Sequence, residues 1–388
     1  MRIVYYLLLV LSLVVCNNCT KKKARTIEDK EGVKSIRNVR PDSSIAVKLD
    51  SIFTIVLDSD IDEDFLNFYP ALYTLDKNSN IFMSNGEKIY KVNNRGKLLT
   101  KFGGKGQGPG EFSSFVSHIF VVDNYLYAYE LSNSTIHKFD TSGRFVKSFP
   151  TDYPLYQILP LKDKTFLALN YSYDNKNKIK STTILKLDLS LRKSKEIYKF
   201  DRKLSKDGFP YDNGMNIHLG DNLYLVYKDR YKYHYDIFSL ETPSHDSIKK
   251  KQSVSKSVYR DDYSDKKMKD IKSEYRKHFP EFKNTFRERL YLWNKKLSLD
   301  IPIVNSFLDN KDYLWIQTTS RDSLEYKFDI FKDGLFRNTY TYTAKENERV
   351  YFYFTGDILL KFSFNIKSGE TFLVANKILY HFMVDNHS

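Results

Sequence analysis

One short stretch, GGKGQGPGEF at residues 103–112, has the composition of a loop that could hold a phosphate group. It contains five of the 15 glycines in a chain of 388 residues. A phosphate-binding loop follows the pattern G-x-x-x-x-G-K-[ST], with the lysine and the hydroxyl at its end. Here Lys105 lies inside the run, and Glu111 and Phe112 follow it. The G-x-G-x-x-G spacing of dinucleotide sites is also missing, so we predict a structural loop and no cofactor.

The eight histidines are scattered along the chain, and His118 is the best candidate for a metal ligand because it directly precedes an apolar stretch. A zinc site needs about three such side chains that converge. The equivalent stretches before Asp76, Asp163 and Asp309 contain no histidine, and His218 is offset from that position. The sequence therefore predicts no metal site.

The other candidates for chemistry are also incomplete. The run DSDIDED, Asp58–Asp64, alternates acids as a calcium loop does, but it lacks the glycine at position six and the glutamate at position twelve. The chain contains neither H-E-x-x-H nor a serine in a G-x-S-x-G context. We expect a solvated acidic turn at this run, and we predict no catalytic residue.

The formal net charge of +14 would suit an anionic partner such as lipid headgroups or acidic glycans. A compositional bias toward lysine, asparagine, tyrosine and isoleucine would produce the same charge. The lysines are spread along the chain and do not cluster, which favours compositional bias as the explanation of the charge. The sequence shows no ordered platform of arginine and aromatic residues, so no nucleic-acid partner is expected.

Two segments repeat one another, and they define the elements that would position any site. Leu75–Gly103 and Val122–Pro150 each contain an apolar residue and an aspartate, a short strand, a second strand that ends in an acid or amide, a turn glycine and a third strand. The turn glycines, Gly96 and Gly143, lie 47 residues apart. Repetition at this period, with several strands in each unit, is the signature of β-propeller blades.

Weaker copies of the pattern bring the predicted number of blades to six. They cover residues 161–188, 220–238, 308–334 and 346–384. Between the fourth and fifth units, Met268, Ile271 and Tyr275 have helical spacing, which predicts a helical insertion over about residues 261–297. An earlier strand, Ile45–Leu57, belongs to no unit. We predict that it completes the last blade and so removes an exposed sheet edge.

The glycine-rich loop and the segment that follows it, FVSHIFVVDNYLYAYELSNSTIHKFDTSGRF at residues 115–145, resemble an NHL-type repeat. With the later FLDNKDYLWI at residues 307–316 and the helical insertion, the chain resembles six-bladed β-propeller lipoproteins of uncharacterised role. The resemblance covers roughly residues 45–385. It implies an all-β propeller in the cell envelope and no established activity. In this fold the glycine loop would connect the outer strand of one blade to the inner strand of the next, where the chain turns sharply.

The first residues have the pattern of a signal peptide. Arg2 precedes an apolar run that ends at Val15, and Cys16 follows it. The run is too short to span a bilayer comfortably. A cysteine at its end resembles the acylated cysteine of bacterial lipoproteins, so we predict a lipoprotein-type signal peptide over residues 1–19 with lipidation at Cys16. Cys19 is the alternative acceptor, and an ordinary secretory signal or an uncleaved anchor is the alternative to lipidation.

These predictions divide the chain and suggest its role. Residues 20–44 are charged and poor in apolar side chains, which predicts a flexible tether. Residues 45–388 form one monomeric propeller domain, held together without disulfides because both cysteines precede it. The leading hypothesis is a membrane-anchored binding or scaffold protein of the cell envelope that presents a propeller rim to a protein or glycan partner. The alternative is a hydrolase or lyase with a site in the central channel.

Overall fold

The computed structural model describes most of the chain. The described residues are 25–56, 72–95, 97–161, 163–174, 176–188, 190–203, 212–229, 233–240, 248–256, 263–283, 303–318, 324–365, 367–368 and 370–382. The predicted signal peptide with Cys16 and Cys19, and the acidic run Asp58–Asp64, lie outside them.

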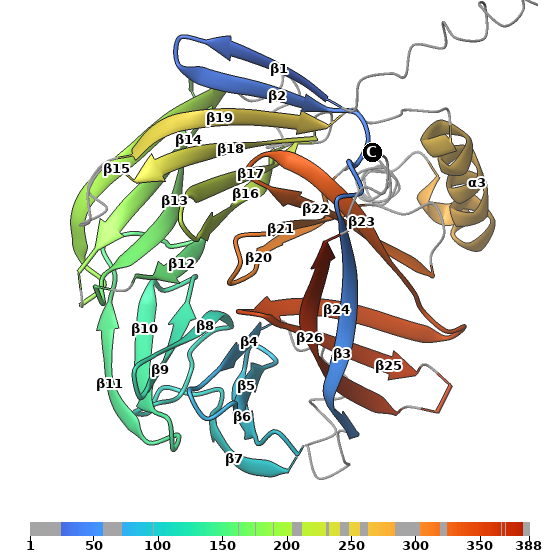
Figure 1. Cartoon of the computed structure of the whole chain (residues 1–388). Helices are drawn as coiled ribbons and strands as arrows, with labels where there is room; N and C mark the ends of the chain where they lie inside the picture. The colour runs from blue at the N-terminus through green and yellow to red at the C-terminus, as the bar shows by residue number, and fades with distance from the viewer. Residues whose placement is uncertain are drawn as a thin grey trace, which may run out of the picture.

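The strands form six sheets that are arranged as blades around a central axis, which confirms the predicted six-bladed propeller (Figure 1). From the axis outward, blade 1 contains β4 (Leu72–Leu75), β5 (Ile81–Ser84), β6 (Lys88–Val92) and β7 (Leu98–Gly103). Blade 2 contains β8 (Val116–Val122), β9 (Tyr125–Glu130), β10 (Thr135–Asp140) and β11 (Phe145–Pro150). Blade 3 contains β12 (Gln157–Pro160), β13 (Phe166–Asp174), β14 (Ile179–Leu187) and β15 (Lys193–Lys203).

The second half of the ring has the same plan, with additions from the N-terminal segment. Blade 4 contains β16 (Asp212–Leu219), β17 (Leu223–Asp229), β18 (Tyr233–Leu240) and β19 (Ile248–Lys256), and then β2 (Val33–Asn38) and β1 (Arg25–Lys30) at its outer edge. Blade 5 contains β20 (Asn305–Leu308), β21 (Leu314–Thr318), β22 (Glu325–Lys332) and β23 (Leu335–Thr343). Blade 6 contains β24 (Glu348–Thr355), β25 (Ile358–Asn365), β26 (Thr371–Phe382) and β3 (Ile45–Val56).

The predicted helical insertion after blade four is confirmed. Helix α3 (Tyr263–His278) and a short 3-10 helix η1 (Pro280–Phe282) lie between β19 and β20 in the chain. Tyr275 is buried, and its ring lies 5.2 Å from that of Phe279. Within the described part of the chain, no helix is long and apolar enough to cross a membrane.

The ring is closed by the N-terminal strand, as predicted. β3 pairs antiparallel with β26 from Phe372 opposite Val56 to Phe382 opposite Ile45. Ile45 is 1% exposed and packs in one cluster with Ile378. Because β3 is the outer strand of blade 6, the two ends of the domain lie in one sheet.

The prediction of a flexible tether over residues 20–44 is wrong for residues 25–38. These residues form the hairpin β1–β2, and β2 pairs in parallel with β19, with Val254 opposite Ile36. Ile36 is buried in the core between blades 4 and 5. The Asn38 amide donates to the Gly334 carbonyl at 3.0 Å and accepts from the Phe336 N–H at 3.2 Å. A few well-placed contacts therefore hold a largely charged segment against the ring.

The acids and amides that mark the repeat cap the tight turns. Asp76 Oδ1 accepts from the backbone N–H groups two and four residues later, each at 2.9 Å. Asn93, Asp140, Asp188 and Asp309 make the same pair of bonds in other turns. An Asx side chain satisfies backbone donors that a two-stranded turn leaves free, so this residue type recurs at fixed positions in the unit.

The glycine-rich loop connects β7 to β8, from blade 1 to blade 2, as predicted. Its backbone closes on itself: the Phe112 N–H donates to the Gly104 carbonyl at 2.7 Å, and the Gly106 N–H donates to the Phe112 carbonyl at 3.0 Å. Phe112 is 1% exposed, and a Cβ on Gly103 would lie 2.4 Å from its ring. Gly103 also has a φ of +76°. The glycines thus let the loop wrap around an aromatic side chain, and the N–H groups of Gly106, Gly108, Glu111 and Phe112 are all used inside the loop.

Candidate binding site in the central channel

The inner strands of blades 2 to 6 line a cavity of about 360 Å³ in the central channel. Its polar lining consists of His118, Gln157, Asn216, His218, Asn305 and Ser306. Its aromatic lining consists of Tyr156, Phe307 and Phe354. No residue in the described lining carries a carboxylate, an ammonium or a guanidinium group.

His118 lies within the inner strand β8 and joins blade 2 to blade 3. Its Nδ1 lies 3.1 Å from Ser117 Oγ, and its ring forms a hydrogen bond with the backbone of Tyr156. Burial in the channel wall lowers the pKa of His118 to about 4, although the bond to Tyr156 acts in the opposite direction. At neutral pH this ring is therefore an uncharged donor and acceptor.

His218 occupies a different position in its repeat unit from that of His118, but it lines the same cavity. Burial, with a smaller effect of the Lys228 ammonium, lowers the pKa of His218 to about 3. His218 Nε2 lies 2.8 Å from Ser306 Oγ, which connects blade 4 to blade 5. The structure therefore brings two neutral imidazoles together in one cavity, on blades that are not adjacent.

A pair of asparagines completes the polar wall between blades 4 and 5. Asn216 Nδ2 donates to Asn305 Oδ1 at 3.1 Å and to Ser306 Oγ at 3.0 Å. These bonds leave Asn216 Oδ1, Asn305 Nδ2 and His218 Nδ1 without a hydrogen-bond partner among the described residues. A ligand in the channel would thus meet an acceptor, a donor and a ring nitrogen that the fold does not use.

The remaining lining residues fix the shape of the cavity. The Gln157 side chain bonds to both backbone groups of Ile217, donating at 2.7 Å and accepting at 2.8 Å, and so ties blade 3 to blade 4. Phe307 and Phe354 stack with their centroids 4.4 Å apart, which joins blade 5 to blade 6. Contacts between neighbouring blades therefore hold the channel wall, and aromatic faces lie beside the polar groups.

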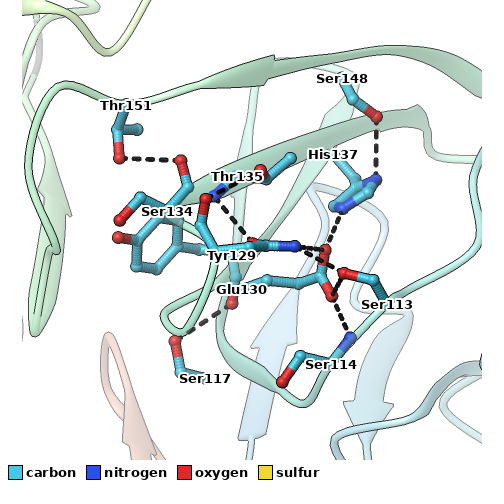
Figure 2. A network of polar contacts seen from close by, with 11 residues as sticks. Ser113, Ser114, Ser117, Tyr129, Glu130, Ser134, Thr135, His137, Ser148 and Thr151 are labelled. Atoms are coloured by element: carbon cyan, nitrogen blue, oxygen red, sulfur yellow. Dashed lines mark hydrogen bonds and ion pairs between the residues drawn. The ribbon is translucent and has the colours of Figure 1, made fainter.

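A second polar network, in blade 2, was not visible in the sequence and is structural (Figure 2). Glu130 Oε2 lies 2.7 Å from His137 Nε2, and Glu130 Oε1 accepts from the Ser114 N–H at 2.6 Å. Burial alone would raise the pKa of Glu130, but hydrogen bonds from Asn133, His137 and the Ser114 backbone outweigh it and hold the pKa below its usual range. Glu130 is 1% exposed. The network therefore fixes the end of the glycine-rich loop to blade 2.

The candidate residues named from the sequence have different places in the structure. His118 reaches the channel, the glycine-rich loop is structural, and Asp58–Asp64 and Cys16 lie outside the described residues. The sequence patterns did not point to Asn216, Asn305 or Ser306. The one sequence feature that could have indicated these residues is their position, because each is a polar residue in the inner strand of a repeat unit.

Comparisons with known proteins agree with this fold. No protein family and no curated protein sequence matches the chain. A protein of Bacteroides fragilis named as exported has a solved structure with 15% identity and a TM-score of 0.54, over 90% of this chain and 99% of that one. A member of the DUF4221 family from Bacteroides vulgatus has 11% identity and a TM-score of 0.51, over 87% and 99%. At these identities the likeness shows the fold alone, and that fold is the β-propeller.

Proposed function

We propose that the protein is a binding protein of the cell envelope whose central channel holds part of an uncharged, hydroxyl-rich ligand, such as a neutral glycan. The observation that carries the proposal is the free polar groups of Asn216, His218 and Asn305 beside aromatic faces, in a cavity whose described lining has no charged side chain. Hydroxyl groups both donate and accept, so they match amides and neutral imidazoles, and aromatic rings pack against the apolar faces of sugar rings.

The envelope location is part of the proposal. It is supported by the N-terminal apolar run that ends at Cys16 and by the exported protein with a similar fold. We propose that a lipid on Cys16 anchors the protein and that the propeller meets its partner from there.

A hydrolase is the second candidate, because the Ser306 hydroxyl lies 2.8 Å from His218 Nε2, as in a nucleophile and its base. Three features favour binding. Ser306 is 2% exposed, so its hydroxyl is poorly placed to attack a substrate. The lowered pKa makes His218 a weak base near neutral pH. No carboxylate orients His218 Nδ1 among the described residues.

The test is a screen of the full chain against an array of neutral glycans, followed by calorimetry on the best binder. We expect saturable binding that Asn305→Leu weakens by about tenfold or more, because it removes the free amide. Asn94→Ala, an exposed position in a blade 1 turn, is the control and should bind normally. Retained binding in Asn305→Leu, or the absence of any neutral glycan ligand, would contradict the proposal. Ester hydrolysis that disappears in Ser306→Ala would favour the hydrolase instead.

A further inference from the structure

A second hollow lies at the outer edge of blade 4, away from the channel. Its volume is about 310 Å³, and four lysines line it: Lys34 from β2, and Lys249, Lys250 and Lys251 from β19. Ser239, Gln252 and the hairpin residue Gly32 complete the described lining. We call this hollow the lysine pocket.

The fold assembles the lysine pocket from distant parts of the chain. β2 lies parallel to β19, with Lys34 opposite Gln252, so Lys34 comes beside the three consecutive lysines. β19 contains an irregularity at this point: Ile237 lies opposite Gln252 and Phe238 opposite Lys250, which leaves Lys251 as an extra residue. Such a bulge re-aims side chains that would otherwise alternate between faces, which brings neighbouring lysines to one hollow.

Of the four lysines of the lysine pocket, one forms an ion pair within the described residues, and Asp29 lies opposite Lys34 in the β1–β2 pairing without forming one. Lys250 Nζ forms an ion pair with Asp236 at 2.8 Å. Lys34, Lys249 and Lys251 form no ion pair within the described residues, and Lys251 Nζ donates to the neutral amide oxygen of Asn222 at 3.4 Å. Three like charges around one hollow repel one another, and a bound anion would relieve that repulsion.

We propose that the lysine pocket binds a phosphate group, carried by a lipid headgroup or by a soluble phosphate ester. Lysine binds phosphate as a point charge and needs no fixed fork geometry. A dianionic phosphate would neutralise two of the three unpaired ammonium groups. The site is separate from the channel, so it does not depend on the function proposed for the channel.

The first arm of the test measures binding of inorganic pyrophosphate to the full chain by calorimetry at low ionic strength. We expect saturable binding that weakens as salt is added. The variant Lys34→Gln/Lys249→Gln/Lys251→Gln should weaken it by about tenfold or more. The matched control Lys97→Gln/Lys345→Gln/Lys367→Gln removes the same charge from exposed positions elsewhere and should bind as the parent does. The melting temperature of each variant shows that it is folded.

The second arm identifies the source of the phosphate group. It compares retention of the parent and the pocket variant on phosphatidylglycerol vesicles with retention on phosphatidylcholine vesicles, so that any N-terminal anchor contributes equally. A preference for phosphatidylglycerol that the pocket variant loses assigns a lipid headgroup. Pyrophosphate binding without that preference assigns a soluble ester. Equal losses in the pocket and control variants, or no saturable binding of pyrophosphate and no vesicle preference, would overturn the proposal.

Discussion

At the scale of single residues, the two channel histidines stand out because their surroundings keep them uncharged. The rings are partly open to the channel, but the protein around them cannot solvate a positive charge well. A positively charged imidazole would also meet no carboxylate in the described lining of the cavity. The same burial that makes these side chains neutral hydrogen-bonding groups should therefore make the fold sensitive to acid.

We predict that the free energy of unfolding falls as the pH falls from 6.5 to 5. Unfolded histidines bind a proton near pH 6.5, whereas folded His118 and His218 do so only near 4 and 3. The unfolded state binds more protons in this window, so acid favours it, by up to about 1.4 kcal/mol per pH unit for each histidine. Urea midpoints at several pH values measure the slope.

The control for this prediction is the variant His118→Gln/His218→Gln, which should have a flatter profile. The fold lowers the pKa of carboxylates such as Glu130 and Asp76. They therefore titrate below pH 5 and do not contribute to the slope between pH 6.5 and pH 5. An identical slope in the parent and the variant would show that other groups control the acid response.

At the scale of elements, the two N-terminal additions to the ring differ in importance. β3 is the outer strand of blade 6, and its removal would leave β26 with an unpaired edge along its length. The hairpin β1–β2 extends a blade that already has four strands. β3 and the hairpin β1–β2 are therefore neighbours in the sequence, but we expect β3 to contribute more to the stability of the domain.

We predict that deletion of residues 45–57 lowers the melting temperature by far more than deletion of residues 25–38. The first deletion removes buried Ile45 and a full set of strand hydrogen bonds, at a cost of several kcal/mol, on the order of the whole stability of a domain. Calorimetry or circular dichroism of both variants measures the difference. A chain without residues 45–57 that melts within about 2 °C of the parent would show that the ring closes in another way.

The sequence predicted the elements well and the contacts between them poorly, for physical reasons. Several turns have an Asx side chain at a fixed place, so Asp76 and Asp140 mark the unit even where the strands differ. In the hairpin β1–β2, Asp29 Oδ1 accepts only from the Gly32 N–H, three residues later, so this turn does not repeat the pattern of the blades. Half of the residues in its strands are charged, and β2 takes its register from the edge of β19. The sequence did not predict the channel site because that site joins residues from different blades. It did not predict the role of Lys34 because the strand that contains Lys34 was predicted to be a tether.

At the scale of the whole molecule, a closed ring offers two surfaces of different character. The channel has neutral polar and aromatic walls. The outer edge of blade 4 has the lysine pocket, and the described chain begins there, at Arg25. If Cys16 carries a lipid, the segment from it to Arg25 spans at most about 30 Å when extended. An anchor at that position would hold the edge of blade 4 near the membrane surface.

We predict that Cys16→Ala abolishes labelling by a palmitate analogue and releases the protein from membranes, because the thiol of Cys16 is the predicted acceptor. Labelling in cells followed by membrane fractionation measures both effects. Cys19→Ala is the matched control and should leave labelling and retention unchanged. Labelling that is lost only in Cys19→Ala would move the acceptor to Cys19.

The pairing of β3 with β26 also constrains how the protein can be made. The strand that closes the ring ends at Val56, and its partner strand ends at Phe382, so five blades are synthesised between the two. Blade 6 therefore cannot form until β26 has emerged from the ribosome, and such a distant contact forms slowly. For a chain that is threaded through a membrane channel in an extended state, this delay is useful. If the protein is exported while it is being synthesised, as the proposed envelope location requires, the topology would keep the polypeptide from completing its fold before β26 has been translocated.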